Sequence, residues 1–126
     1  MKASEFQLIN QRLVASSFKI NKNYKKEEIK LDINTKVNIA KSNTDNLASV
    51  TLILEIFKEE DLENNPYYIK LEIEGHFEWR NIENIEQYLQ VNAPAVLFSY
   101  LRSIIIQLTV MSGFPPLNLP LINFNK

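Results

Sequence analysis

Apolar and polar residues alternate along the first two thirds of the chain with a period of two. Within residues 67–79 the odd positions are apolar, and most of the even positions carry a charged side chain. This period is typical of a β-strand with one buried face and one exposed face. The same pattern predicts strands over residues 50–57 and 29–39. Gly75 stands on the apolar side, which predicts a bulge or a second element packed closely against the strand.

Residues 6–20 form a further apolar run, but the run changes phase near its middle. Ile9 and Leu13 fall on the opposite parity from the other apolar residues of the run. A β-bulge or bend near residues 10–12 explains the change. Polar connections separate the runs at residues 21–28, 41–46 and 58–66, and the last of these is short enough for a hairpin.

Residues 94–112 predict one long helix. Asn92 is a typical N-cap, and Pro94 suits the first turn, where no backbone N–H is needed. Gly113 suits the left-handed position after a helix, and the prolines that follow prevent the helix from resuming. Most of the helix circumference is apolar, through Val96, Leu97, Phe98, Tyr100, Leu101, Ile104, Ile105, Ile106, Leu108, Val110 and Met111.

Three explanations account for so wide an apolar surface. A membrane-spanning helix needs about 18 nearly uninterrupted apolar residues, and Ser99, Arg102, Ser103 and Gln107 interrupt this one. A helix buried on all sides within a monomer is uncommon in a chain of 126 residues. We therefore expect a second subunit to cover part of the helix, and we expect no membrane insertion.

Strands followed by a long helix predict an α+β fold with a single domain over residues 1–126. We expect a four-stranded antiparallel sheet, the long helix packed on one face, and a C-terminal extended arm at residues 113–124. The arm is apolar and rich in proline, which favours extended backbone and prevents a helix.

Composition narrows the function classes. The formal net charge is −1 without a basic stripe, which argues against a dedicated nucleic-acid binder. The absence of cysteine and of an apolar signal-peptide core predicts a cytoplasmic protein. His76 is the single histidine, two glycines form no phosphate loop, and the carboxylates at residues 59–63 lack the central glycine of a calcium loop. We expect no enzymatic activity, metal or cofactor.

Three segments toward the C-terminus resemble the SecB export-chaperone family. They read G-H-F-E-W-R-N-I-E-N, N-A-P-A-V-L-F-S-Y-L-R-S and S-G-F-P-P-L-N-L-P-L-I-N-F. The family hallmark is a helix that opens with P-x-x-L-F-x-Y-x-R and ends in an apolar G-F-P arm. Here the hallmark falls on Pro94, Leu97, Phe98, Tyr100, Arg102, Gly113, Phe114, Pro115, Leu117, Leu119, Pro120, Asn123 and Phe124.

The resemblance implies a homotetramer built as a dimer of dimers, with the long helix between dimers. It also implies that unfolded polypeptides are held in apolar grooves without ATP, in the service of protein export. The expected subunit contacts are Ile69, Leu71, Ile73, Tyr100, Leu101, Ile104, Ile105, Leu108 and Met111.

A chaperone of this kind needs exposed apolar and aromatic surface, and it binds extended clients by burying their side chains. Each candidate residue for that surface has an alternative role in the core or in a subunit interface. The candidates are Phe18, Ile20, Tyr24, Ile53, Phe57, Phe114, Leu117, Leu119, Leu121, Ile122 and Phe124.

The chain also departs from the family pattern. Typical members continue beyond the arm into a second helix, whereas this sequence ends at Lys126, so we expect the groove wall to be incomplete, supplied differently or simply more open. Family members dock onto the translocase ATPase SecA through acidic residues of the sheet, and two of these positions align with Lys19 and Lys70. Because this charge reversal turns attraction into repulsion, we expect no SecA docking.

Two other functions stay open. Some SecB-like proteins protect the antitoxin of a toxin–antitoxin pair, and a short, divergent member suits that role. From a different class, a small carrier of an apolar ligand would hold its ligand in an enclosed pocket between the sheet and the helix.

Overall fold

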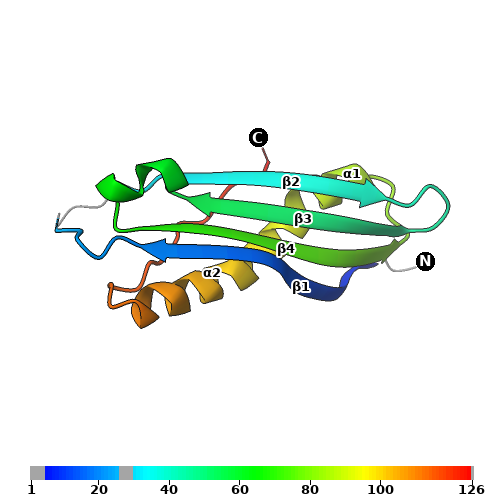
Figure 1. Ribbon diagram of the computed structural model, residues 1–126. Helices are drawn as coiled ribbons and strands as arrows, with labels where there is room; N and C mark the ends of the chain where they lie inside the picture. The colour runs from blue at the N-terminus through cyan, green and yellow to red at the C-terminus, as the bar shows by residue number, and fades with distance from the viewer. Residues whose placement is uncertain (1–4, 26–29, 126) are drawn as a thin grey trace.

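The computed structural model describes residues 5–25 and 30–125, and it confirms the predicted α+β fold. One antiparallel sheet has a helical rod lying obliquely across a single face (Figure 1). The elements, in chain order, are β1 (Glu5–Ile20), β2 (Ile33–Lys41), β3 (Leu47–Ile56), the 3₁₀ helix η1 (Glu59–Asn64), β4 (Tyr67–Arg80), α1 (Ile85–Gln87), the π-helical turn η2 (Tyr88–Asn92) and α2 (Ala93–Met111).

The strand order in the sheet is β1-β4-β3-β2. The polar connections on either side of β3 join neighbouring antiparallel strands. The hairpin that was predicted at residues 58–66 is the connection between β3 and β4. In contrast, β1 pairs with β4, which lies far along the chain. Strand β2 begins at Ile33, and Ile29, the first residue of the predicted run, lies outside the described residues.

Strand β1 contains two register shifts rather than the single one predicted. They lie between Leu8 and Asn10 and between Leu13 and Ala15, so the phase change starts slightly before the expected stretch and is completed after it. Each shift adds one residue that β4 does not match, and such β-bulges increase the local twist of a strand. Ile9 and Val14 occupy these extra positions, and both side chains are exposed.

The core lies between the sheet and α2. Strands β3 and β4 bury alternate side chains beneath the helix, as their period predicted: Val50, Leu52, Leu54, Ile56, Tyr67, Ile69, Leu71, Ile73, Phe77 and Trp79. We call this side of the sheet the covered face and the other side the open face. The close packing predicted at Gly75 is confirmed, because Leu97 of α2 lies directly over it.

The helical rod begins earlier than predicted. Asn92 has helical φ and ψ angles and no side-chain cap, so its assignment as the N-cap was wrong. Helical structure starts at Ile85 and passes through the π-helical turn into α2. Pro94 lacks an N–H and crowds the preceding turn, and a wider π turn accommodates such a break without ending the helix. By length and hydropathy alone the rod could cross a membrane, a property that core helices of soluble proteins share.

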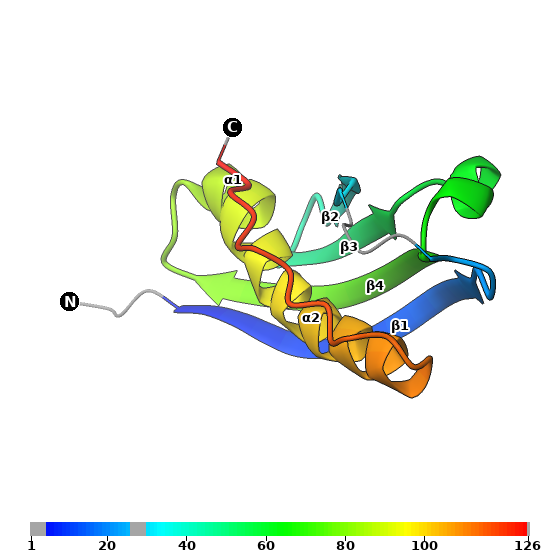
Figure 2. The same ribbon diagram turned by 90° about the vertical axis from the view of Figure 1, so that its left-hand side faces the viewer.

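Gly113 ends the rod in the left-handed conformation, with φ of 85°, as predicted. Beyond it the chain is extended and runs back along α2 toward α1 (Figure 2). We call residues 113–125 the arm. The arm and α2 therefore lie together on the covered face.

Candidate functional site

Aromatic side chains gather where the arm leaves α2. Tyr67 of β4 contacts Phe114 of the arm edge to face, with ring centroids 5.2 Å apart. Its ring centroid lies 5.9 Å from that of Phe57 and 6.4 Å from that of Phe18. Burial raises the pKa of the Tyr67 hydroxyl, and Tyr24 adds to the rise. Aromatic groups from β1, from the residue that follows β3 and from the arm thus converge on one residue of β4.

The proximal part of the arm is held to α2 by hydrogen bonds. The Thr109 hydroxyl accepts a hydrogen bond from the Leu117 N–H at 3.1 Å and donates to the Ile105 carbonyl at 2.9 Å. The Thr109 carbonyl accepts from the Phe114 N–H at 3.1 Å. Thr109 is fully buried, so these bonds are shielded from water. The direction in which the arm leaves the helix is therefore well defined.

Farther along, some side chains of the arm point toward the core and others away from it, and the alternation between them slips at Pro120 and Leu121. Leu119 is only 2% exposed, whereas Leu121 is 84% exposed. Phe124 packs edge to face on Phe98 of α2, with ring centroids 6.1 Å apart. The arm thus adds an apolar outer layer to the covered face while leaving large apolar groups in solvent.

The helix exposes apolar groups as well. Met111 is 83% exposed, and Val110, Tyr100 and Val96 are also exposed. Leu101 and Ile105 face the sheet and are fully buried, and Phe98 is covered partly by the arm. Part of the apolar circumference of α2 is therefore covered within one chain, and the exposed remainder lies toward its C-terminal end and along its outer side.

The predicted client residues divide into four groups. Phe18, Ile20, Tyr24, Phe114, Leu117, Ile122 and Phe124 are half-buried, and Leu121 is exposed. Phe57 and Leu119 are buried in the core, so they offer no surface to a client in this conformation. Ile53 pairs with Glu72 across the open face, away from the arm.

The expected subunit contacts divide in a similar way. Ile69, Leu71 and Ile73 point from β4 toward α2, and Leu101 and Ile105 point back toward the sheet, so all five are buried within the chain. They have no free surface for a second subunit. Tyr100 and Met111 are exposed, and Ile104 and Leu108 are half-buried. Only the last four stay available as contacts.

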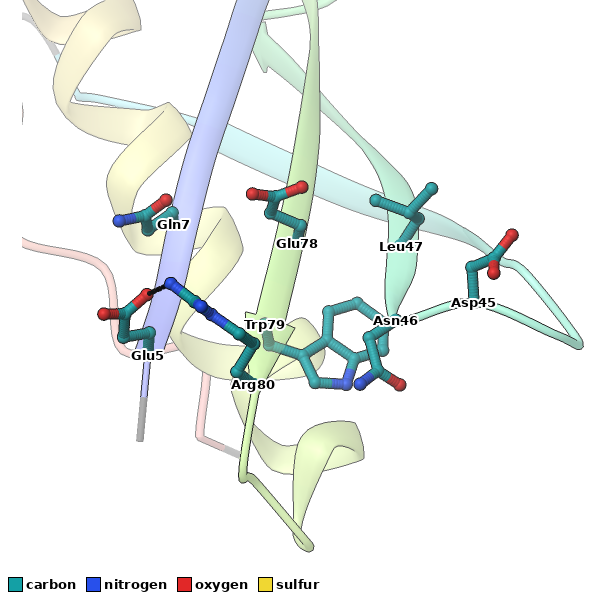
Figure 3. Close-up of a pocket in the computed structure, with 8 residues that line it drawn as sticks. All are labelled: Glu5, Gln7, Asp45, Asn46, Leu47, Glu78, Trp79 and Arg80. Atoms are coloured by element: carbon teal, nitrogen blue, oxygen red, sulfur yellow. Dashed lines mark hydrogen bonds and ion pairs between the residues drawn. The ribbon is translucent and has the colours of Figure 1, made fainter. Parts of the chain in front are cut away.

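The open face carries polar side chains and two adjoining shallow hollows. The first has a volume of about 590 Å³ and lies at the end of the sheet, where Arg80 forms an ion pair with Glu5 on the neighbouring strand (Figure 3). The second, of about 560 Å³, shares Leu47 and Glu78 with the first. A carrier of an apolar ligand would need an enclosed pocket between sheet and helix, and neither hollow lies there.

Charged groups on the open face pair with one another. Glu74 lies 3.0 Å from Arg12 and 3.3 Å from the His76 Nε2. Lys19 forms an ion pair with Glu59 of η1, and Lys70 pairs in register with Glu55 of β3. Within residues 5–25 and 30–125, no three His, Asp or Glu side chains come together as a metal site would require.

Two residues of the covered face escaped the sequence analysis as site residues. Tyr67 appeared only as a buried strand position, although its parity places it beside the start of the arm. Thr109 was not singled out in the sequence, because nothing in its local pattern indicated a contact eight residues away. A small polar residue one turn before a helix-ending glycine is the signal that could have identified it.

Comparisons with known proteins agree with this architecture. A family model described as preprotein translocase subunit SecB matches residues 10–126. Relatives include the uncharacterized protein MJ0357 of Methanocaldococcus jannaschii, 30% identical over 79% of this chain and 66% of that protein. The protein-export protein SecB of Jannaschia sp. (strain CCS1) is 32% identical over 75% of this chain and 58% of that protein. The matched segment thus spans less than two thirds of either relative.

Solved structures show the same fold at low sequence identity. The SecB-like chaperone Rv1957 of Mycobacterium tuberculosis, solved with a peptide from the HigA1 antitoxin, matches with a TM-score of 0.71 and 16% identity. That match covers 94% of this chain and 88% of Rv1957. Because the family model matches nearly the whole chain, including the helix and arm that carry the resemblance, this chain belongs to the SecB family.

Proposed function

We propose that this chain is an ATP-independent chaperone that holds unfolded or non-native polypeptides on its covered face. The observation that carries the proposal is the apolar surface left partly open beside a complete core, where Phe18, Phe114 and Leu117 are half-buried and Leu121 is 84% exposed. A monomeric protein without an apolar partner rarely keeps such groups in solvent. Membership of the SecB family supports the chaperone class and a role in protein export.

The client surface extends from the Tyr67 cluster along α2, where the arm lies. Phe18, Phe114 and Leu117 border it, and Ile122 and Phe124 of the arm pack on the same apolar surface. An extended polypeptide would bury its own apolar side chains there, and each fully buried Leu or Phe would contribute about 1.5–3 kcal/mol. Such binding needs no cofactor, which fits the absence of any nucleotide-binding motif in the sequence.

We further propose that the protein works as a homo-oligomer in the cytoplasm. The remaining contacts, Tyr100, Ile104, Leu108 and Met111, lie on the outer and C-terminal part of α2. A second copy packing on them would cover apolar surface that the sheet and the arm leave open. A dimer of dimers is the arrangement that the family resemblance implies.

Protection of an antitoxin is the second candidate within the same class. Rv1957, which shares the fold, was solved with an antitoxin peptide. The positions expected to dock SecA carry Lys19 and Lys70. Their positive charges would repel the positively charged groups of SecA that acidic residues at these positions would attract. Export through SecA predicts measurable binding to purified SecA, whereas the antitoxin role predicts none.

Aggregation of heat-denatured citrate synthase, followed by light scattering, tests the proposed function. Equimolar protein should suppress most of the scattering without ATP. A variant, Phe114→Asp, adds a charge at the half-buried start of the arm, on the client surface, and should suppress it less. Unchanged scattering with the parent protein would rule the proposal out.

A further inference from the structure

The two halves of the arm are attached to the body of the protein in different ways. Residues 113–117 form backbone hydrogen bonds to α2, through the N–H groups of Gly113, Phe114 and Leu117. In the part of the chain that the structure describes, no backbone group of residues 118–124 forms a hydrogen bond to the body. Near the end of the arm the Gln87 Nε2 donates a hydrogen bond to the Asn125 Oδ1 at 3.3 Å, and this bond is exposed.

Side-chain burial therefore holds the distal half. Leu119 enters the core, and Ile122 and Phe124 pack partly against it. Asn118, Leu121 and Asn123 point to solvent between them, and Pro120 has no N–H to offer. Apolar side chains set into an apolar surface and a largely unpaired backbone are also what an extended polypeptide client would present.

We infer that residues 118–125 form a displaceable strap, which occupies part of the polypeptide-binding surface as an intramolecular client. The hydrogen-bonded residues 113–117 act as its fixed end, and an incoming unfolded polypeptide displaces the distal half. This inference rests on the proposed function. Its consequence is quantitative, because the apparent affinity for a client equals the intrinsic affinity multiplied by the fraction of molecules whose strap is open.

A covalent lock tests the strap without removing any apolar side chain. The chain has no cysteine, so Gln87→Cys with Asn125→Cys provides a unique pair that a short bis-maleimide can bridge. The probe is fluorescein-labelled α-lactalbumin kept unfolded by reduction and carboxymethylation, and fluorescence anisotropy reports its binding. Bridging should weaken binding on the order of ten-fold or more, because the closed state becomes the only state.

The matched control bridges Arg12→Cys to Glu74→Cys, which face each other on the open face. That link should leave binding unchanged. Equal binding by the bridged and unbridged strap variants would overturn the strap and leave the proposed function intact. If the unbridged protein does not bind the probe, the proposed function fails, and the strap inference fails with it.

A spin label gives a second, independent measurement. A nitroxide at Asn125→Cys should become more mobile when unlabelled carboxymethylated α-lactalbumin saturates the protein. A nitroxide at Asn38→Cys, on the open face of β2, should keep its mobility. A label at residue 125 that stays immobile while the probe is bound would contradict displacement.

Discussion

Gly75 of β4 lies directly beneath Leu97 of α2, and a β-carbon at Gly75 would lie 2.8 Å from the Leu97 Cδ2. The same β-carbon would also come within 3.0 Å of Phe77 and 3.1 Å of Leu8. Real β-carbons essentially never show the first of these distances, so a methyl group added at Gly75 would require the Leu97 side chain or its neighbours to shift. The missing side chain at Gly75 therefore lets Leu97 pack directly on β4.

Gly75→Ala should therefore destabilise the fold. The added methyl group forces Leu97 or the helix to move, and overpacking of this kind costs about 1–3 kcal/mol. Urea unfolding would measure the loss, and adding Leu97→Ala to Gly75→Ala should recover part of it relative to the sum of the single changes. A Gly75→Ala variant as stable as the parent would contradict the close approach.

Thr109→Val should loosen the start of the arm. Valine matches the shape of threonine but cannot accept the Leu117 N–H, and a buried donor left without an acceptor costs about 1–3 kcal/mol. Thr109→Ser keeps the hydroxyl and is the matched control. Amide exchange at Leu117, measured by NMR, should accelerate in the valine variant and change much less in the serine variant. Equal exchange in both would show that the hydroxyl does not hold the arm.

Stability should decline at alkaline pH because of Tyr68. Burial raises the pKa of Tyr68 to about 12, helped by its hydrogen bond to Glu55 at 3.0 Å and by the charges of Glu55, Glu59 and Glu60. An unfolded tyrosine loses its proton near pH 10, whereas the folded chain keeps it. The folded state then binds more protons than the unfolded state, so the free energy of unfolding falls as pH rises from 10 to about 12.

Tyr68→Phe removes this contribution. Its free energy of unfolding should fall less steeply across that pH window, although the variant starts about 1 kcal/mol less stable at neutral pH because Glu55 loses its donor. Guanidinium unfolding at a series of pH values compares the two slopes. Parallel slopes for parent and variant would assign the alkaline loss to other groups.

The subunit contact can be tested at residues that the core does not use. Tyr100→Glu with Met111→Glu places two charges on the exposed side of α2, so the isolated subunit should keep its fold. If a second copy packs there, the burial of unpaired charges should dissociate it, and light scattering after size exclusion should show a lower mass. Asn38→Glu with Asn43→Glu, both exposed and away from α2, is the charge-matched control. An unaltered mass in the helix variant would exclude this contact.

The periodicity of the strands was sufficient to predict which residues of β3 and β4 are buried, and Gly75 was identified as a close contact. The pairing of β1 with β4 could not be predicted, because a period of two identifies the buried face of a strand but not its neighbour. Asn92 was misassigned because Pro94 resembles the start of a helix, and only tertiary packing shows that a π turn continues the rod through it.

The same limit applies to the candidate site. Ile69, Leu71 and Ile73 are apolar in the sequence whether α2 of the same chain or another subunit covers them. The structure assigns that cover to Leu97, Leu101 and Ile105 of the same chain. Leu119 likewise resembled an exposed arm residue, and its burial depends on how Thr109 directs the chain.

The central claim is that the covered face binds unfolded polypeptide. Isothermal titration calorimetry tests it most directly, with one client protein, α-lactalbumin, titrated in its unfolded and in its native form. Reduced, carboxymethylated α-lactalbumin should bind with a negative heat-capacity change, the mark of buried apolar surface, while native α-lactalbumin should give no heat. Phe114→Asp, a change at the half-buried start of the arm, should weaken that binding. Equal binding of the native and the unfolded form, or no binding of either, would contradict the account.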